Sequence, residues 1–139
     1  MPRRYVLEDQ VGHLLRRAHQ RATQIFLETF EDAGLTPTQW AALARLGEEG
    51  AASQNHLGRL TAMDPATVQG VVQRLEKRGL VDREPDPDDR RRTRIKLSAA
   101  GAELVARHTG SGAAVSARTL EPLTAAEREA FLALLRRLA

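Results

Sequence analysis

The sequence contains no cysteine among its 139 residues, and only 4% of them are aromatic. Disulfide bonds, thiolate metal ligands and thiol-based redox sensing are therefore excluded. A core must be built from leucine, alanine and valine, a composition that favours helices. No apolar run approaches the roughly 20 residues of a membrane span. Residues 1–5 lack the apolar segment of a signal peptide. We expect a cytoplasmic protein with no membrane partner.

The residue patterns typical of an enzyme are also missing. The sequence has no nucleophile–base pair at a recognisable spacing and no glycine loop of the kind that binds phosphate. Its four histidines share no metal-ligand spacing. We therefore predict a protein that is not an enzyme, with no catalytic residue, no metal site and no cofactor.

The charge is only slightly unbalanced. A net charge of +3 is too small by itself to establish binding to nucleic acid. The local cluster of arginines within residues 90–94 is more informative than the total, because a patch of cations marks a surface that can bind phosphate.

Residues 63–79 predict a capped amphipathic helix. Asp64 can cap it, Pro65 suits its first position, and Gly79 suits the residue that ends it. Apolar residues recur at i, i+3, i+4 and i+7 and form one face, made of Val68, Val71, Val72 and Leu75. The other side carries hydrogen-bonding and cationic groups, with one carboxylate, Glu76, near its edge: Thr67, Gln69, Gly70, Gln73, Arg74 and Lys77.

The next residues change to the two-residue period of a β-hairpin. A first strand begins at Leu80 and is stopped by Pro85, and residues 93–97 return as a second strand that alternates apolar and basic side chains. The tip between them, residues 86–92, holds three aspartates and three arginines. A helix followed by such a hairpin is a winged-helix layout. In such a layout the helix would enter a major groove of DNA, and the wing would reach the DNA backbone or the adjacent minor groove.

The residues before this stretch predict three helices. After a loose arm over residues 1–8, a helical pattern runs from about residue 9 to residue 33. A capping box over residues 36–39 opens a helix that runs to about residue 47. Residues 50–52 are expected to form a turn. Ser53 can then cap a short third helix, residues 54–60, which completes a helix-turn-helix.

Two further helices follow the hairpin. Ser98 can cap the first, which runs to about Arg118, and Gly110 and Gly112 predict a kink or a frayed stretch within it. A second capping box, residues 124–127, opens a last helix that reaches Leu138. The apolar stripes at the two ends of the chain are longer than one small domain needs, which predicts packing against a second copy.

The central stretch resembles the winged helix-turn-helix of the MarR family of transcription regulators. The resemblance rests on residues 74–81 (RLEKRGLV), 86–91 (DPDDRR) and 97–101 (LSAAG), which occur in the family's order and spacing. The flanking helices extend the match to nearly the full chain. The resemblance implies a mainly α fold with a small β-hairpin wing.

The family's architecture also implies a division of the chain. A winged helix-turn-helix DNA-binding domain is expected at residues 34–98. It would be flanked by N- and C-terminal dimerisation helices at residues 1–33 and 99–139. Two recognition helices related by a two-fold axis suit a palindromic operator.

Three groups of residues are candidate DNA contacts. The polar face of residues 64–78 can contact base edges, because glutamine pairs with adenine and threonine contacts the thymine methyl group. Gly70 lets the backbone approach closely. The start of the third helix can bind phosphate through Ser53, Gln54 and Asn55. The wing supplies cations for the backbone, namely Arg90, Arg92 and Arg94. The resemblance implies that Asp89 stabilises the wing and that Arg91 enters the groove or contacts phosphate.

Each group has a simpler interpretation. The polar helix face is then only solvated, and Ser53 only caps its helix. The aspartates and arginines of the wing tip then neutralise one another. These alternatives stay open at the level of the sequence.

The MarR resemblance also implies a small-molecule effector. Members of the family often bind small aromatic acids between the terminal helices and the winged helix. Arg16, His19 and Trp40 offer a cation, an imidazole and an indole that suit a planar carboxylate or its thioester. The alternative is a packed core with solvated arginines.

The predicted function is therefore a ligand-responsive, dimeric DNA-binding transcription regulator. In this family such a protein is most often a repressor that binds a palindromic operator. An effector would favour a dimer whose recognition helices are badly spaced for DNA. The rival is a winged-helix module that binds protein, and salt-dependent DNA affinity would separate the two.

Overall fold

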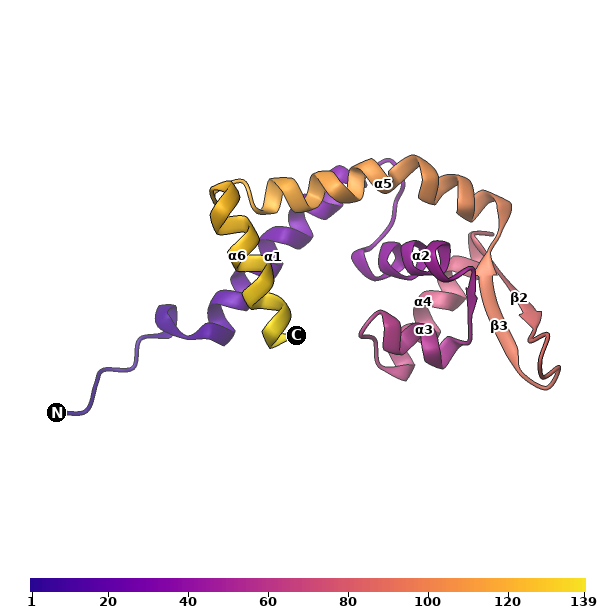
Figure 1. Cartoon of the computed structure of the whole chain (residues 1–139), viewed down its shortest axis with the longest axis horizontal. Helices are drawn as coiled ribbons and strands as arrows, with labels where there is room; N and C mark the ends of the chain where they lie inside the picture. Colours follow the sequence, from indigo (N-terminus) through magenta and orange to yellow (C-terminus); the bar gives the residue numbers. More distant parts are fainter. The chain divides into compact units, whose positions relative to one another are not determined.

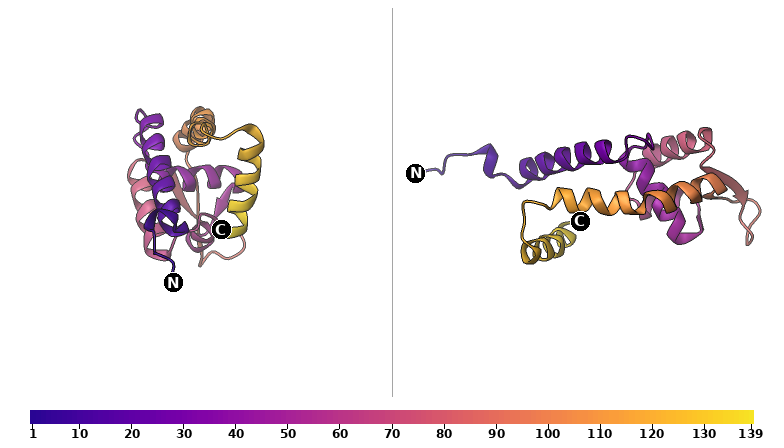
Figure 2. Two further views of the ribbon diagram at one scale, coloured as in Figure 1. Left: turned by 90° about the vertical axis from the view of Figure 1, so that its left-hand side faces the viewer. Right: turned by 90° about the horizontal axis from the view of Figure 1, so that it is seen from above.

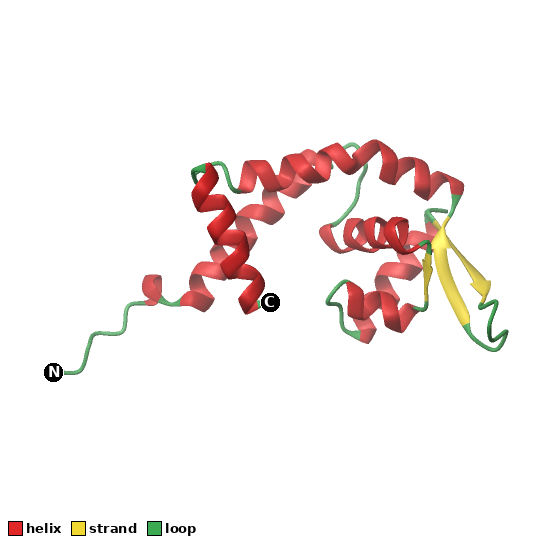
Figure 3. Cartoon of the chain, viewed as in Figure 1, coloured by secondary structure: helices red, strands yellow, loops and turns green.

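The computed structural model describes all 139 residues and is mostly helical, with one small antiparallel sheet (Figures 1 and 3). The chain divides into two compact units. The winged unit is Phe30–Gly110. The arm unit combines Met1–Thr29 with Ser111–Ala139. The predicted fold class, a mainly α winged helix-turn-helix, is confirmed.

The winged unit contains three short helices, the sheet and the first part of α5 (Ala99–Thr119), as far as Gly110. The helices are α2 (Pro37–Glu49), α3 (Gln54–Leu60) and α4 (Pro65–Lys77). The sheet has the order β1-β3-β2, formed by β1 (Ala51–Ala52), β2 (Val81–Pro85) and β3 (Thr93–Leu97). Strands β2 and β3 form the predicted hairpin, with Val81 opposite Leu97 and Pro85 opposite Thr93.

The predicted caps begin these helices. Thr36 and Gln39 form both bonds of the capping box of α2, each 3.2 Å long. Ser53 accepts a hydrogen bond from the backbone N–H of His56 and caps α3. Asp64 caps α4. The starts of all three helices are therefore fixed by local chemistry.

The core of the winged unit lies between α2, α3, α4 and the sheet. Leu43, Leu57, Val72 and Leu75 are fully buried within it. Gly58 permits close contact in the helix-turn-helix, because a Cβ atom there would lie 3.2 Å from the Met63 carbonyl oxygen and 3.3 Å from Val68. The four apolar residues predicted to form one face of α4 are all buried.

The first helix is shorter than predicted. Helix α1 (Val11–Thr29) follows a 3-10 turn at Leu7–Asp9 and ends four residues before the predicted end. The Phe30 carbonyl accepts the N–H groups of Ala33 and Gly34, and Gly34 takes a φ of 62°. The Phe30 ring is buried within the winged unit, 4.9 Å from Trp40 and 5.5 Å from His108. This burial is a tertiary contact that the helical pattern does not contain.

The predicted turn at residues 50–52 is wrong in its last two residues. Ala51 and Ala52 form β1 and pair with Lys96 and Ile95 of β3. Gly50 alone makes the turn, with a φ of 81°. Two alanines are too few to show an alternating pattern, so only the partner strand defines them as a strand.

Of the kink or frayed stretch predicted at Gly110 and Gly112, the frayed stretch is wrong. Helix α5 (Ala99–Thr119) continues through both glycines. Each glycine costs a helix only about 1 kcal/mol, which is less than an interruption with several unpaired backbone groups costs. The boundary between the two units falls inside α5, after Gly110, since Leu104 and His108 are buried in the winged unit. The sequence-based boundaries had assigned the whole helix to the arms.

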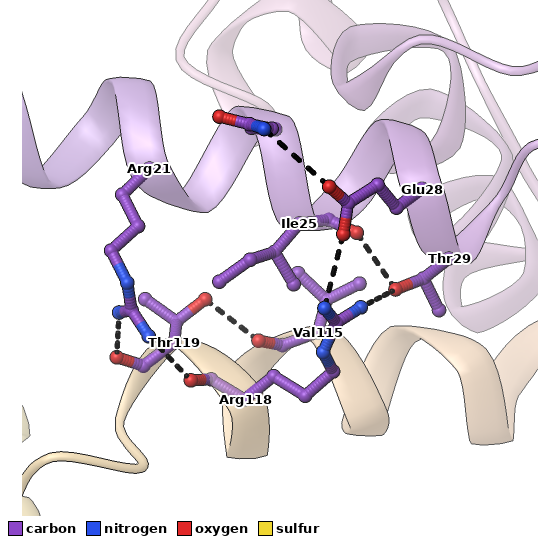
Figure 4. Close-up of polar contacts among 8 residues, drawn as sticks. Arg21, Ile25, Glu28, Thr29, Val115, Arg118 and Thr119 are labelled. Carbon is purple, nitrogen blue, oxygen red and sulfur yellow. Dashed lines mark hydrogen bonds and ion pairs between the residues drawn. The ribbon is translucent and has the colours of Figure 1, made fainter.

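The arm unit consists of α1, the end of α5 and α6 (Ala125–Leu138). Figure 2 shows the end of α5 between α1 and α6. Arg118 binds Glu28 at 3.0 Å and donates to the Thr29 hydroxyl at 3.1 Å, and Arg21 donates to the Arg118 and Thr119 carbonyls (Figure 4). The negative end of the α5 dipole also stabilises a cation at these carbonyls.

An apolar groove runs between α1 and α6. It is lined by leucines and other apolar residues, namely Val11, Leu14, Leu15, Ala18, Phe131, Leu134, Leu135 and Leu138. Most of these side chains are exposed to solvent in the single chain. None of the helices combines the length and the apolar character that crossing a membrane requires.

Candidate nucleic-acid interface

Helix α4 presents one polar face because its other face is buried. Asp64 accepts the Thr67 N–H and the Thr67 hydroxyl, each at 2.8 Å, and these bonds lower the pKa of the Asp64 carboxyl, the backbone N–H contributing most. The remaining candidate residues of α4 take no part in this helix cap. Gln69, Gln73, Arg74 and Lys77 are exposed. Thr67 keeps only its methyl group and the acceptor capacity of its hydroxyl for a ligand.

Gly70 allows one arginine to fold back onto the helix. A Cβ atom at Gly70 would lie 3.2 Å from Nη1 of Arg74. The guanidinium of Arg74 therefore covers the helix surface where any other residue would carry a side chain. A shallow depression follows along α4, lined by Gly70, Gln73, Arg74, Glu76 and Lys77.

A second depression, the cationic groove, lies between α3 and the stem of the wing. It is lined by Ser53, Gln54, Asn55, Arg59, Arg83, Arg92 and Thr93. The Ser53 hydroxyl is occupied by its cap, and the Gln54 side-chain oxygen accepts from Arg83 at 3.3 Å. Asn55 is exposed. Three arginines and two amides therefore face one groove, which suits a phosphate backbone.

The Asp89 carboxylate contacts two arginines of the wing tip. It accepts the Arg91 backbone N–H at 3.1 Å and the Arg91 Nε at 3.2 Å, and the Arg92 Nε lies 3.8 Å away. The Arg91 side chain is still 92% exposed and that of Arg92 is 79% exposed. Arg90 is exposed and forms no ion pair. The Asp86 carboxylate also accepts the Asp88 backbone N–H at 2.8 Å, so two carboxylates order the loop and its cations remain exposed.

Arg94 does not join the other wing arginines. Its guanidinium pairs with Glu84 on the neighbouring strand, and Lys96 pairs with the same carboxylate at 2.7 Å. The bond from Lys96, followed by the bond from Arg94, lowers the pKa of Glu84. Arg94 is therefore committed to the stem of the hairpin.

The sequence interpretation did not include Arg59 and Arg83 among the candidates. Arg59 lies one helical turn after Asn55, a spacing that places both on one face of α3 and could have identified it. Arg83 points to partners on two other elements, and this depends on the tertiary fold. No local pattern in the sequence could have identified that role.

The three effector candidates are divided between the units. Arg16 and His19 lie on α1 of the arm unit and are exposed. Trp40 lies on α2 of the winged unit, where it is half-buried and packs against Phe30. Each is thus accessible within its own unit.

The chain is similar to several known regulators. The model of the MarR family matches residues 33–92. NicR of Pseudomonas putida, an HTH-type transcriptional repressor, is 42% identical over 96% of this chain and 85% of NicR. A probable transcriptional regulator from Pseudomonas aeruginosa is 49% identical with a TM-score of 0.91, over 96% of this chain and all of that one.

A further solved structure is that of BpsR from Bordetella bronchiseptica, whose DNA binding is regulated by 6-hydroxynicotinic acid. It is 40% identical, with a TM-score of 0.92, over 97% of this chain and 96% of BpsR. These similarities include the helices at both ends of the chain as well as the winged unit.

Proposed function

The chain belongs to the MarR family of transcription regulators, and from that premise we propose that it is a homodimeric repressor whose binding to a near-palindromic operator is released by a small aromatic acid. The observation that carries the proposal is the polar face of α4, which lies beside the cationic groove and the exposed arginines of the wing. One element offers groups for base edges, and the others offer cations for the backbone.

The two parts have different roles in this proposal. Gln69 and Gln73 contact base edges in the major groove, with Thr67, Arg74 and Lys77 beside them. Arg90, Arg91 and Arg92 contact phosphate or enter the minor groove, and Asp89 holds their loop. Ser53, Gln54 and Asn55 contribute backbone or amide contacts at the edge of the same groove. Arg94 takes a smaller part, because its guanidinium is held by Glu84 on the neighbouring strand.

The dimer is formed by the arm unit. The apolar groove between α1 and α6 exposes leucines that a single chain leaves in water. Covering them with the same helices of a second copy places two recognition helices on a two-fold axis. The operator then has two half-sites whose centres are about one helical turn apart.

The effector is an aromatic carboxylate or its thioester. The regulation of BpsR by 6-hydroxynicotinic acid supports this class, since that compound is a planar aromatic acid. Arg16, His19 and Trp40 are our candidate contacts. Calorimetry with 6-hydroxynicotinic acid should detect binding below millimolar concentration, and Arg16→Ala should keep DNA affinity while losing the response. Absence of such binding in the wild type would remove this part of the proposal.

The chain acts in the cytoplasm, where the DNA of a bacterium lies. It acts as a regulator and not as an enzyme. The family to which it belongs consists of transcription regulators, and this supports both statements.

The proposed function is tested by a salt titration. An operator is first selected from random duplexes with the purified protein, and affinities are then measured on the operator and on a random duplex. Arg91→Ala should weaken binding to both and lower the slope of log affinity against log salt by about one unit. Gln73→Ala should cost roughly 1–3 kcal/mol on the operator and little on the random duplex.

The outcomes separate the rivals. If Arg91→Ala changes nothing, the wing tip is a self-neutralised loop. If the wild-type protein shows no salt-dependent preference for any duplex, the winged helix is a protein-binding module and the proposed function is wrong.

A further inference from the structure

Arg83 joins three elements of the DNA-binding surface. It lies on β2, at the stem of the wing, opposite Ile95 of β3. Its Nε donates to Glu76 on α4 at 2.8 Å, and its Nη2 donates to Gln54, the first residue of α3, at 3.3 Å. A guanidinium can hold two acceptors in a fixed plane, and a lysine ammonium cannot do so.

The environment of Arg83 differs from that of the arginines at the wing tip. The Arg83 side chain is 38% exposed, whereas Arg92, which lines the same groove, is 79% exposed. The Arg92 Nε lies 3.8 Å from Asp89, too far for a hydrogen bond, while Arg83 makes two hydrogen bonds to two different elements. Arg83 is thus held in place, and Arg92 can move to meet a phosphate.

Both partners of Arg83 belong to the surface that faces DNA in the proposed function. Glu76 is the one carboxylate lining the depression along α4, where an unpaired negative charge would repel phosphate. The Gln54 Oε1 accepts from Arg83, so the two hydrogens on its Nε2 remain available as donors. Arg83 therefore neutralises the Glu76 carboxylate, which would repel phosphate. It also orients the Gln54 amide so that its N–H groups can donate to DNA.

We propose that Arg83 is a positioning residue that sets the recognition helix α4 and the start of α3 relative to the stem of the wing, and thereby determines operator specificity rather than general DNA affinity. The inference rests on the proposed function, because it assigns a role within the same surface. An exposed ion pair adds little to the stability of a fold, so the effect lies in alignment.

The alternative is that Arg83 is itself a phosphate ligand, and the two roles predict different measurements. A positioning residue changes the ratio of operator affinity to random-duplex affinity and leaves the salt slope unchanged. A phosphate ligand lowers the salt slope by about one unit and leaves that ratio unchanged.

The experiment compares Arg83→Lys and Arg83→Gln with the same two substitutions at Arg92. Fluorescence anisotropy on the selected operator and on a random duplex gives the ratio and the slope at several salt concentrations. Arg83→Lys, which keeps the charge, should reduce the ratio on the order of tenfold with an unchanged slope. Arg92→Gln should lower the slope by about one unit with an unchanged ratio.

A double variant tests whether Arg83 acts through Glu76. Glu76→Gln should reduce the same ratio, and Arg83→Lys combined with Glu76→Gln should be no worse than the more severe single change. Melting curves of the variants check that the fold is retained.

Three results would overturn the inference. One is a lower salt slope with an unchanged ratio in Arg83→Gln, and another is an unchanged ratio in Arg83→Lys. The third is simple additivity with Glu76→Gln. If the wild-type protein prefers no duplex, the proposed function fails first, and the inference fails with it.

Discussion

The winged unit buries its apolar side chains, whereas the arm unit leaves most of its large ones exposed. All but two of the buried hydrophobic side chains belong to the winged unit, and the two exceptions are Ile25 and Phe26 of α1. The large hydrophobic side chains that remain exposed all belong to the arm unit. Both units are made from helices with regular apolar stripes, so the stripe alone does not say whether its partner is in the same chain.

The difference indicates which unit can bury its apolar side chains without a second chain. Burying a leucine side chain contributes about 1.5–3 kcal/mol. The winged unit gains this stabilisation within one chain. The side chains that line the groove between α1 and α6 can gain it only against a partner chain. Substitutions should therefore affect assembly in one unit and folding in the other.

The largest effect is expected in the arm unit. Leu14→Asp puts a charge into the apolar groove and should convert the dimer to a monomer at micromolar concentration. Operator affinity should fall on the order of a hundredfold or more, because the two half-sites are no longer bound together. Analytical ultracentrifugation and operator titration measure the two changes.

Leu27→Asp is the matched control for this variant. Leu27 lies on the same helix and is 50% exposed, compared with 48% for Leu14, but it does not line the groove. It should leave the dimer intact. If both variants stay dimeric, or if the wild type is itself a monomer, the groove is not the interface.

A smaller but clear effect is expected in the packing of the winged unit. A Cβ atom on Gly101 would lie 2.0 Å from the Leu80 carbonyl oxygen, which is backbone and cannot move freely. Gly101→Ala should destabilise the protein by about 3 kcal/mol, as overpacking in a tight site does. Urea unfolding followed by circular dichroism gives the value.

Gly110→Ala is the counterpart on the same helix. No atom lies within 4 Å of a Cβ atom there, and alanine is the better helix former by about 1 kcal/mol, so this variant should be slightly stabilised. Equal destabilisation by both variants would show that α5 tolerates no side chain at either position, which contradicts the contrast between packed and open sites.

The smallest effect concerns pH. The bonds from Thr67 lower the pKa of Asp64 below its ordinary value of 3.8, so the charged carboxylate stabilises the folded state. This contribution is complete above that value and is lost as the pH falls through the lowered pKa. Asp64→Asn keeps a capping oxygen without the charge, so its stability should depend less on pH below about 4.

The comparison needs a carboxylate that caps no helix. Asp82→Asn removes an exposed carboxylate of β2 and should leave the acid dependence of the wild type unchanged. Thermal melts from pH 7 to pH 3 test both variants. Identical acid profiles for Asp64→Asn and the wild type would mean that the cap charge does not contribute to stability.

The local features of the fold could be predicted from the sequence, and the features set by distant contacts could not. The start of α4 follows from Asp64, Pro65 and an apolar stripe, all within one short segment. The end of α1 depends on the burial of Phe30 against Trp40 and His108, and β1 exists only because β3 lies beside it.

The same limit applies to the candidate interface. The sequence predicts which residues of α4 face outward, because that follows from the helical period. It does not predict that Glu84 engages Arg94 or that Arg83 connects Glu76 with Gln54. Which partner a cation takes depends on side chains brought together by folding. Which cations pair with a carboxylate of the protein and which stay exposed is therefore seen only in the folded chain.

The sheet of the wing also bears on the solubility of the protein. Its two edge strands are β1, which has only two residues, and β2, which carries Asp82, Arg83 and Glu84 and ends at Pro85. Short edges, charged side chains and proline all discourage a strand of another molecule from pairing with an exposed edge. A hairpin that must project into solvent to reach a ligand is in this way a poor template for aggregation, even at high protein concentration.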